Sequence, residues 1–331
     1  MMANWKTGLR APICITWEIT SSCNLACKHC LAANMVFPAG DLDFIEATEL
    51  INQLAEMEVF YINIGGGEPF IRKDILAILQ YVNLKGIPIQ LSTNGTLIDD
   101  QLAKMLSEIT DLRFQVSLDG ARLETNDFIR GPGSFAGAVD AVRVLVKRGL
   151  PVSVNFVVTK DNLHELEDCY QLARQYGAKF RVTRLRPSGQ ARKTYDSCHL
   201  DISQYRKLYS WLLQRPDVST GDSFFFLSVL GKPLSGMNSC GAGTMTCSVA
   251  PNGDVYPCAF LMDEEKAGSI RRKSFAEIWH RSILLNKFRE KEISECEDCL
   301  QYVNCGGGCP AVSVYYSGQL FDRDPECLIL P

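Results

Sequence analysis

The chain lacks any long apolar run. No stretch approaches the roughly 18 consecutive apolar residues that a membrane-spanning helix needs. The first residues also lack the order of a basic start, an apolar stretch and a small-residue cleavage site that is typical of a signal peptide. We therefore expect a cytoplasmic protein that has no membrane partner.

Long basic runs are missing as well. The sequence has 34 Lys and Arg against 38 Asp and Glu, which gives a formal net charge of -4 and a pI of about 5.7. The densest basic cluster, Arg271, Arg272 and Lys273, is typical of a solvated turn before a helix. A general nucleic-acid-binding protein carries a basic surface, so we expect no nucleic-acid partner.

What the chain does have is size and cysteine. Its 331 residues, 46% of them hydrophobic and 22% charged, can bury a substantial core and favour one large domain with a smaller one. It contains 14 cysteines. In a reducing compartment, metal or cluster ligation is a better explanation for so many thiols than disulfide bonding.

Three of these cysteines lie close together in "SSCNLACKHC", residues 21–30: Cys23, Cys27 and Cys30. A structural zinc site takes four ligands and a disulfide takes two, so three thiols leave one coordination position of a metal centre open. A partial zinc knuckle with His29 as fourth ligand is the alternative, but His29 lies between two of the thiols and is poorly spaced to join them.

Short β-like runs alternate with helical patterns along the first part of the chain. This alternation predicts βα units and a parallel sheet. Six units are two short of a closed eight-stranded barrel, so we predict an α/β fold built as an open, partial (β/α)6 barrel whose chemistry lies at the C-terminal ends of the strands. The predicted strands span residues 13–19, 59–64, 87–92, 112–118, 152–158 and 179–185, and the helices include 43–58, 72–84, 99–109, 134–148 and 162–176.

The loops after these strands hold the candidate ligand-binding and catalytic residues. The cysteine trio follows the first strand, and a run of three glycines with Glu68 follows the second. We expect the glycines to let the backbone approach a ligand closely and Glu68 to accept a hydrogen bond from a cationic amine. A tight turn with no ligand is the alternative. Polar residues end the third and fourth strands, namely Ser92, Thr93, Asn94, Ser117 and Asp119.

The pattern C-x-x-x-C-x-x-C after the first strand and G-G-E-P after the second resembles the radical S-adenosylmethionine (SAM) enzymes. The resemblance implies that Cys23, Cys27 and Cys30 hold a [4Fe-4S] cluster by three irons and that SAM chelates the fourth. Thiolates suit such a cluster because they are soft ligands. The resemblance places Ser117 and Asp119 near the ribose and pairs Arg130 with the SAM carboxylate, with a surface loop as the alternative for Arg130. The cofactor contacts it implies are Gly66, Gly67, Glu68, Ser117, Asp119, Arg130 and, at an adenine-seating position, His29.

A second group of cysteines occupies the C-terminal part. It resembles the SPASM extension of peptide-modifying radical SAM enzymes, which implies two auxiliary [4Fe-4S] clusters and three clusters in all. We place the barrel at residues 1–235 and the SPASM domain at residues 236–331. Two structural zinc sites are the alternative, because C-x2-C is also a zinc spacing. The resemblance assigns Cys240, Cys247, Cys258 and Cys309 to one cluster and Cys296, Cys299, Cys305 and Cys327 to the other.

Nine stretches, including "APICITWEITSSCNLACKHC", "IRGPGSF" and the closing "DPEC", resemble the family of mycofactocin radical SAM maturases. The resemblance implies oxidative decarboxylation of the C-terminal tyrosine of a ribosomal precursor peptide and its cross-linking to the adjacent valine. Little sequence lies before the first strand or after Cys327, so we expect a separate small peptide-recognition protein, with reduced flavodoxin or ferredoxin as electron donor. Maturases of sulfatases, of the pyrroloquinoline quinone precursor and of thioether peptides are the alternatives.

Two other protein classes fit part of the pattern. A cluster-bearing electron-transfer module needs the thiols but not the Gly66 to Pro69 turn, and a zinc-scaffolded interaction protein would be colourless. Within the enzyme class, we predict that Arg184 or Arg186, at the end of the sixth strand, binds the carboxylate of the peptide through its planar fork of donors. A surface salt bridge is the alternative for both. Of the remaining cysteines, Cys14 and Cys169 are typical buried hydrophobes and Cys198 receives no role.

Overall fold

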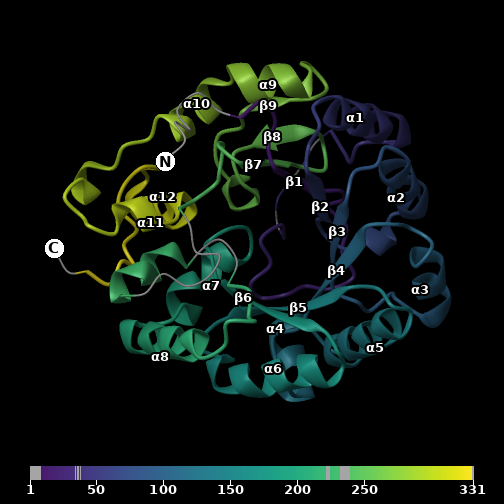
Figure 1. Ribbon diagram of the computed structural model, residues 1–331, viewed down its shortest axis with the longest axis horizontal. Helices are drawn as coiled ribbons and strands as arrows, with labels where there is room; N and C mark the ends of the chain where they lie inside the picture. Colours follow the sequence, from purple (N-terminus) through teal and green to yellow (C-terminus); the bar gives the residue numbers. More distant parts are fainter. Residues whose placement is uncertain are drawn as a thin grey trace.

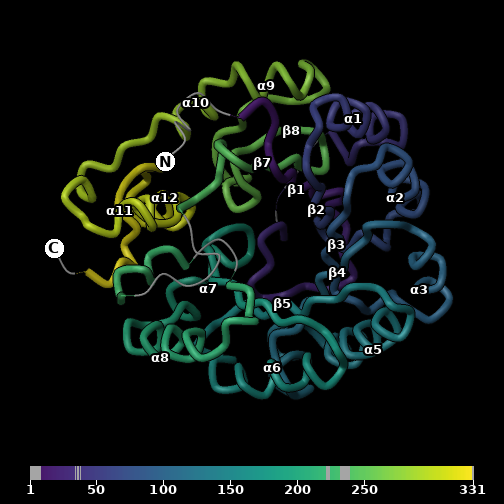
Figure 2. Tube along the Cα trace, viewed as in Figure 1, coloured from purple at the N-terminus to yellow at the C-terminus, as the bar shows by residue number. Residues whose placement is uncertain are grey.

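The protein forms a ring of strands lined on its outside by helices (Figure 1). The computed structural model describes residues 9–33, 35, 37, 39–220, 224–231 and 239–329. The chain runs around the ring in sequence order through the sixth strand, and the following strands return to the side of the first (Figure 2). This arrangement brings the loops that follow all six strands to one rim.

The six predicted strands are present and parallel, in the order β6-β5-β4-β3-β2-β1. The predicted bounds agree with the observed ones to within about two residues, which confirms the partial (β/α)6 barrel. The strands are β1 (Cys14–Glu18), β2 (Tyr61–Gly65), β3 (Ile89–Thr93), β4 (Leu112–Ser117), β5 (Val152–Val158) and β6 (Lys179–Arg184).

Helices connect successive strands, as a parallel sheet requires. The first begins at Asp43, whose side chain accepts from the backbone N–H of Glu46 while Glu46 accepts in return, a capping box. The predicted helices are α1 (Phe44–Glu56), α2 (Ile75–Leu84), α3 (Asp100–Leu106), α5 (Ser134–Lys147) and α6 (Leu166–Gln175). The structure adds α4 (Leu123–Arg130), α7 (Ala191–Cys198) and α8 (Ile202–Leu213), and short 3-10 turns at η2 (Pro69–Ile71), η3 (Leu163–Glu165) and η4 (Phe225–Leu230).

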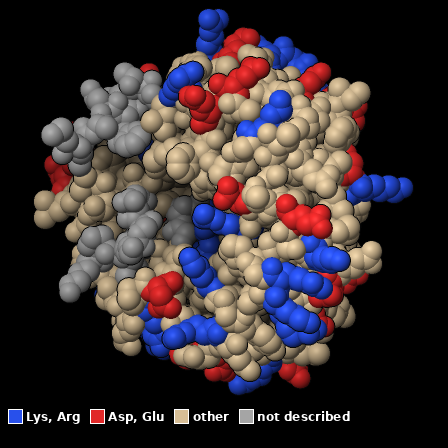
Figure 3. Space-filling model, turned by 45° about the vertical axis from the view of Figure 1, so that its right-hand side comes forward, with Lys and Arg blue, Asp and Glu red and all other residues tan. Residues whose placement is uncertain are grey.

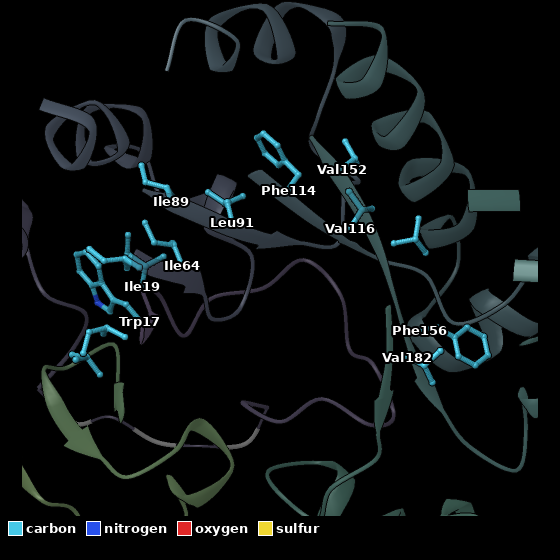
Figure 4. Packing of buried hydrophobic residues seen from close by; sticks show 14 of the residues in the cluster. Trp17, Ile19, Ile64, Ile89, Leu91, Phe114, Val116, Val152, Phe156 and Val182 are labelled. Carbon is cyan, nitrogen blue, oxygen red and sulfur yellow. The ribbon is translucent and has the colours of Figure 1, made fainter. Parts of the chain in front are cut away.

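The two faces of the sheet differ in chemistry because side chains alternate along each strand. One face packs against the helices and is apolar, with Trp17, Ile64, Leu91, Phe114 and Val116 among its buried residues (Figure 4). The opposite face lines the inside of the ring. It carries polar side chains that bond to one another, such as Ser92 Oγ to Asn63 Oδ1 at 3.3 Å and Gln115 Nε2 to Ser92 Oγ at 3.4 Å.

The C-terminal segment extends the same sheet. Strand β7 (Thr246–Val249) pairs in parallel with β1, and β8 (Asp254–Tyr256) and β9 (Gly268–Ser269) follow antiparallel, so the described residues form one sheet of nine strands. The expected domain boundary between residues 235 and 236 lies outside the described residues, and the division stays a prediction. The remaining elements are η5 (Ala259–Leu261), α9 (Phe275–Arg281), α10 (Ile283–Arg289), η6 (Ser294–Cys296), α11 (Tyr302–Cys305) and α12 (Pro310–Ser317).

Charged side chains of both signs are interspersed on the face shown in Figure 3. Lys and Arg lie next to Asp and Glu there rather than in one basic field. Within the described part of the chain, no helix has the length and apolar character needed to cross a membrane.

Candidate iron-sulfur and cofactor site

The cysteine loop that follows β1 lies against residues that follow β3 and β4. Cys23 Sγ accepts from the backbone N–H of Leu25 at 3.5 Å and lies 4.0 Å from Asn94 Nδ2, which follows β3. Cys27 Sγ lies 3.5 Å from the backbone oxygen of Arg130 at the end of α4. The structure therefore brings the trio to the C-terminal rim of the strands.

The three thiols influence one another. Burial raises the pKa of Cys27 to about 11; Arg130 opposes the shift, and Cys30 and Cys23 add to it. Burial also raises the pKa of Cys23. A bound metal centre deprotonates such thiols and stabilises them as thiolates. This donor set, three soft ligands in one partly exposed loop, fits the open-sited [4Fe-4S] cluster that the sequence predicts.

The glycine run after β2 has a role that the sequence did not predict. A Cβ on Gly67 would lie 2.0 Å from the backbone oxygen of Ser22, and one on Gly66, whose φ is 122°, would lie 2.6 Å from that of Thr20. Gly67 N donates to Thr20 O at 2.8 Å. These two glycines are therefore required because the loop packs directly against the backbone that leads into the cysteine trio.

Glu68 makes contacts within the protein that the sequence did not predict. Its side chain is fully buried and accepts from Thr93 Oγ1 and from the backbone N–H of Asn94, both at 2.8 Å, and from Phe70 N at 3.3 Å. Burial raises its pKa, and these hydrogen bonds oppose that shift. These hydrogen bonds show that Glu68 fastens the glycine loop to the end of β3. Its predicted contact with the cofactor amine stays a prediction.

Asp119 joins two other predicted cofactor residues beneath the cysteine loop. Its fully buried Oδ2 lies 3.0 Å from His29 Nε2 and 2.5 Å from Arg130 Nε. Burial raises the pKa of Asp119, but Arg130 and His29 together hold it below its ordinary value. Arg130 is buried, which overturns the surface-loop alternative. Asp119 thus positions His29 and Arg130, while the assignments of all three to parts of SAM stay predictions.

Ser117 ends β4 and lies opposite Asn155 on β5. It is partly buried on the polar inner face of the ring, the same face that carries Ser92 and Gln115. Its predicted place near the ribose stays a prediction.

The prediction that Arg184 binds the peptide carboxylate is wrong. Alternation along β6 places Arg184 on the face of Val182, toward the helices, and its side chain is fully buried. Its Nη atoms bind Asp324 in a bidentate pair at 2.7 and 2.9 Å, and Nη2 also binds Glu326 at 2.7 Å. A guanidinium whose donors are occupied in this way has no planar fork left for a substrate.

Arg186 lies two residues further along, beyond the end of the strand. Its guanidinium carbon lies 3.3 Å from the centre of the Phe260 ring, and its charge lowers the pKa of Cys309 against the burial that raises it to about 11. Arg186 is 7% exposed. Its role toward the peptide stays a prediction.

The eight C-terminal cysteines fall into neighbourhoods that bear on the predicted cluster assignment. Burial raises the pKa of Cys305 to about 12, and Asp324 and the thiols of Cys327 and Cys296 add to the shift. Cys299 and Cys327 act in the same way on Cys296. These four thiols form one predicted set. In the other set, Cys309 lies near Cys240, and Cys247 lies near Cys14. Cys258 directly precedes η5.

In the described ranges, no three His, Cys, Asp or Glu side chains converge on the position of one metal ion. The cluster assignment therefore stays a prediction.

A buried ionic network near the C-terminus was missed in the sequence. Glu326 accepts from Tyr195 and Tyr205 hydroxyls, both at 2.5 Å, and lies 3.2 Å from His199 Nδ1. Burial raises its pKa, but Arg184 and these donors lower it to about 2. Asp324 Oδ2 also accepts from Cys309 N at 3.0 Å. The only sequence signal was two acids beside Pro325 and Cys327.

Comparisons with known proteins agree with this geometry. The Radical SAM superfamily model matches residues 17–173, and the SPASM iron-sulfur cluster-binding domain matches residues 240–300. The mycofactocin maturase MftC of Mycolicibacterium smegmatis is 41% identical over 335 residues, which cover 99% of this chain and 86% of that protein. This chain belongs to the mycofactocin maturase family of radical SAM enzymes. It is a radical SAM enzyme that uses [4Fe-4S] clusters and SAM.

More distant relatives share the whole length. The AdoMet-dependent heme synthase of Methanosarcina barkeri is 32% identical, with 97% of each chain covered. Among solved structures, Streptococcus suis SuiB bound to S-adenosylmethionine matches with a TM-score of 0.78 at 19% identity, covering 97% of this chain and 78% of that one. The AdoMet-bound anSMEcpe matches with a TM-score of 0.72 at 20% identity, covering 95% and 93%. These structural matches show the fold.

Proposed function

We propose that this enzyme oxidatively decarboxylates the C-terminal tyrosine of a ribosomal precursor peptide and then cross-links it to the adjacent valine. The observation that carries this proposal is the 41% identity to a mycofactocin maturase over 99% of the chain. The cysteines support it as well. Three are at positions that fit a radical SAM site, and eight form the C-terminal group that resembles a SPASM domain.

Each part of the site has a task in this reaction. Cys23, Cys27 and Cys30 would hold the cluster that reduces SAM, and SAM supplies the alkyl radical that takes a hydrogen atom from the peptide. The glycine loop and Glu68 fix the cysteine loop against β2 and β3. Asp119 fixes the imidazole of His29 and the guanidinium of Arg130 beside it. The polar inner face of the ring then orients the peptide.

Substrate binding and electron supply complete the proposal. Arg186 remains the residue proposed for the peptide carboxylate, since a buried guanidinium beside the Cys309 loop places a cation on the C-terminal side of the barrel. We further propose a separate small peptide-recognition protein as partner, reduced flavodoxin or ferredoxin as electron donor, and a place in the reducing cytoplasm. SuiB has been solved with its precursor peptide SuiA, which supports a peptide substrate for this fold.

An anaerobic assay tests the proposal. The reconstituted enzyme is incubated with SAM, dithionite and a precursor peptide that ends in Val-Tyr, with and without the proposed recognition protein. The expected product has lost CO2 and two hydrogens, and it forms together with 5'-deoxyadenosine. A peptide that ends in Val-Ala serves as control. If the enzyme cleaves SAM but leaves the Val-Tyr peptide unchanged with the partner present, the proposed substrate is wrong.

A further inference from the structure

An unpaired acid lies on the inner face of the ring. Glu18 is the last residue of β1 and is paired in register with Gly65 on β2. It lies on the polar inner face, since its strand neighbours Trp17 and Ile19 belong to the apolar core (Figure 4). A Cβ on Gly65 would lie 3.7 Å from Glu18 Oε2 and 3.7 Å from Ser92 Cβ. The carboxyl group thus lies between the cysteine loop's strand and the glycine loop.

The surroundings of Glu18 offer it no partner. It is 4% exposed, and within the described part of the chain its carboxyl group has no hydrogen bond or ion pair. Its partner on β2 is Gly65, and the inward residue of β7 that is paired with the preceding inward residue of β1 is Ser248; neither is ionisable. The ionisable Cys14 and Tyr61 lie at the other end of these strands. Burial alone raises the pKa of Glu18 to about 7.

A buried carboxyl group without a donor is costly unless a ligand brings one. The other polar side chains nearby on the inner face are neutral and already bond to one another, as Asn63, Ser92 and Gln115 do. A tyrosine ring that enters the ring of strands brings an aromatic body and one O–H donor that needs an acceptor. The Glu18 carboxylate, which has no donor, can accept the hydrogen bond that this O–H group would donate.

We propose that Glu18 is a catalytic residue that accepts the phenolic proton of the substrate tyrosine while that tyrosine is oxidised. This inference rests on the proposed function, because it requires a tyrosine in the site. A base acts best when its pKa lies near the working pH, and Glu18 meets that condition.

The hydrogen atom on the tyrosine β-carbon passes to the 5'-deoxyadenosyl group. The remaining carbon radical gives one electron to an auxiliary [4Fe-4S] cluster and its phenolic proton to Glu18, which leaves a quinone methide. The Cα–carboxylate bond then breaks, CO2 departs, and its electron pair forms the Cα=Cβ double bond. The phenolate oxygen regains the proton from Glu18, which ends unchanged.

The experiment compares the parent enzyme with Glu18→Gln, which keeps the shape and removes the base. The matched control is Glu49→Gln, the same change at an exposed acid on helix α1 outside the ring. Peptides ending in Val-Tyr and Val-Phe are used with each. For Glu18→Gln, we expect decarboxylation of the tyrosine peptide to fall about 100-fold. The SAM dissociation constant, the uncoupled formation of 5'-deoxyadenosine and any turnover of the phenylalanine peptide should remain within about twofold of the parent. Glu49→Gln should match the parent throughout.

The pH profile of the parent enzyme gives a second readout that does not depend on a variant. Glu18 is protonated below its pKa and accepts a proton only above it, so the rate with the tyrosine peptide should rise with pH through about 7 and then level. Glu18→Gln should lack this rise.

Three results would overturn the inference. Parent-like decarboxylation by Glu18→Gln makes Glu18 a bystander. A tenfold weaker SAM affinity assigns it to the cofactor's amine instead. An equal loss with both peptides shows a packing effect. None of these is confused with failure of the proposed function, in which the parent enzyme itself leaves the tyrosine peptide unchanged.

Discussion

The two cysteine-bearing regions of the molecule are held in different ways. The N-terminal trio lies in one loop, with Cys23 exposed, and that loop is fixed by backbone contacts such as Gly67 N to Thr20 O and Gln190 N to Cys30 O. The C-terminal cysteines are spread over a long segment, several of them buried, and are tied to the barrel by the ion pair of Arg184 with Asp324.

This difference indicates that the N-terminal loop serves the reaction and that the C-terminal network stabilises the fold. A loop held by backbone contacts at the rim leaves its thiols accessible, which suits a cluster that must meet a cofactor. A buried charge network joins β6 to the loops of Cys309 and Cys327. It allows few other arrangements of these segments, because breaking it leaves charges without partners in the core. Changes in the first region should therefore affect activity, and changes in the second should affect stability.

The largest effect on activity should follow from replacing Cys23, Cys27 and Cys30 together with Ala. SAM cleavage should be abolished while the fold survives. Iron should fall from on the order of twelve to on the order of eight per chain, since one of three four-iron clusters is lost. Iron and sulfide analysis with electron paramagnetic resonance checks this. Loss of all iron from a folded variant would show that the assignment of ligands is wrong.

The largest effect on stability should follow from Arg184→Met. The change leaves Asp324 and Glu326 buried without their cation, at a cost of about 3–5 kcal/mol. Anaerobic denaturant unfolding measures it. Arg143→Met is the matched control, because its pair with Asp140 is exposed and should contribute less than about 1 kcal/mol. Equal stability of the two variants would contradict the claim that the buried network of Arg184 stabilises the fold.

A smaller and more local effect is expected for Gly67→Ala. The added Cβ would lie 2.0 Å from Ser22 O, so the cysteine loop must shift, and SAM cleavage should fall by more than about tenfold with auxiliary iron retained. Gly65→Ala, whose Cβ meets only ordinary contacts from 3.7 Å, is the control for cluster content. Full SAM cleavage by Gly67→Ala would mean that the close approach is not required.

The smallest effect is expected for Cys198→Ser. Cys198 lies at the end of α7, near Asp161 and away from both cysteine groups in the sequence. Iron content and SAM cleavage should equal those of the parent. A lower iron content would identify Cys198 as an overlooked ligand.

Much of the fold could be predicted because its signals are local. Alternation of β-branched residues placed β5 at its observed bounds, and polar residues after strands marked the rim. The pairing of β7 with β1 and the ion pair of Arg184 with Asp324 join residues that are far apart in the sequence. No local sequence pattern predicts either of them.

The same limit explains the error at Arg184. Alternation along β6 puts Arg184 on the face of Val182, but the sequence could not show that this face meets the helices. The motif also could not show that Glu68 and Gly67 pack against the protein's own backbone, which only the folded loops reveal.

The measurement that tests the central claim most directly uses a precursor peptide whose C-terminal tyrosine carries deuterium at the β-carbon. The account predicts that deuterium appears in 5'-deoxyadenosine in step with decarboxylated peptide, and that the Cys23, Cys27 and Cys30 triple variant forms neither product. Decarboxylated peptide with no deuterium in 5'-deoxyadenosine, or 5'-deoxyadenosine formed at the same rate with no change in the peptide, would contradict it.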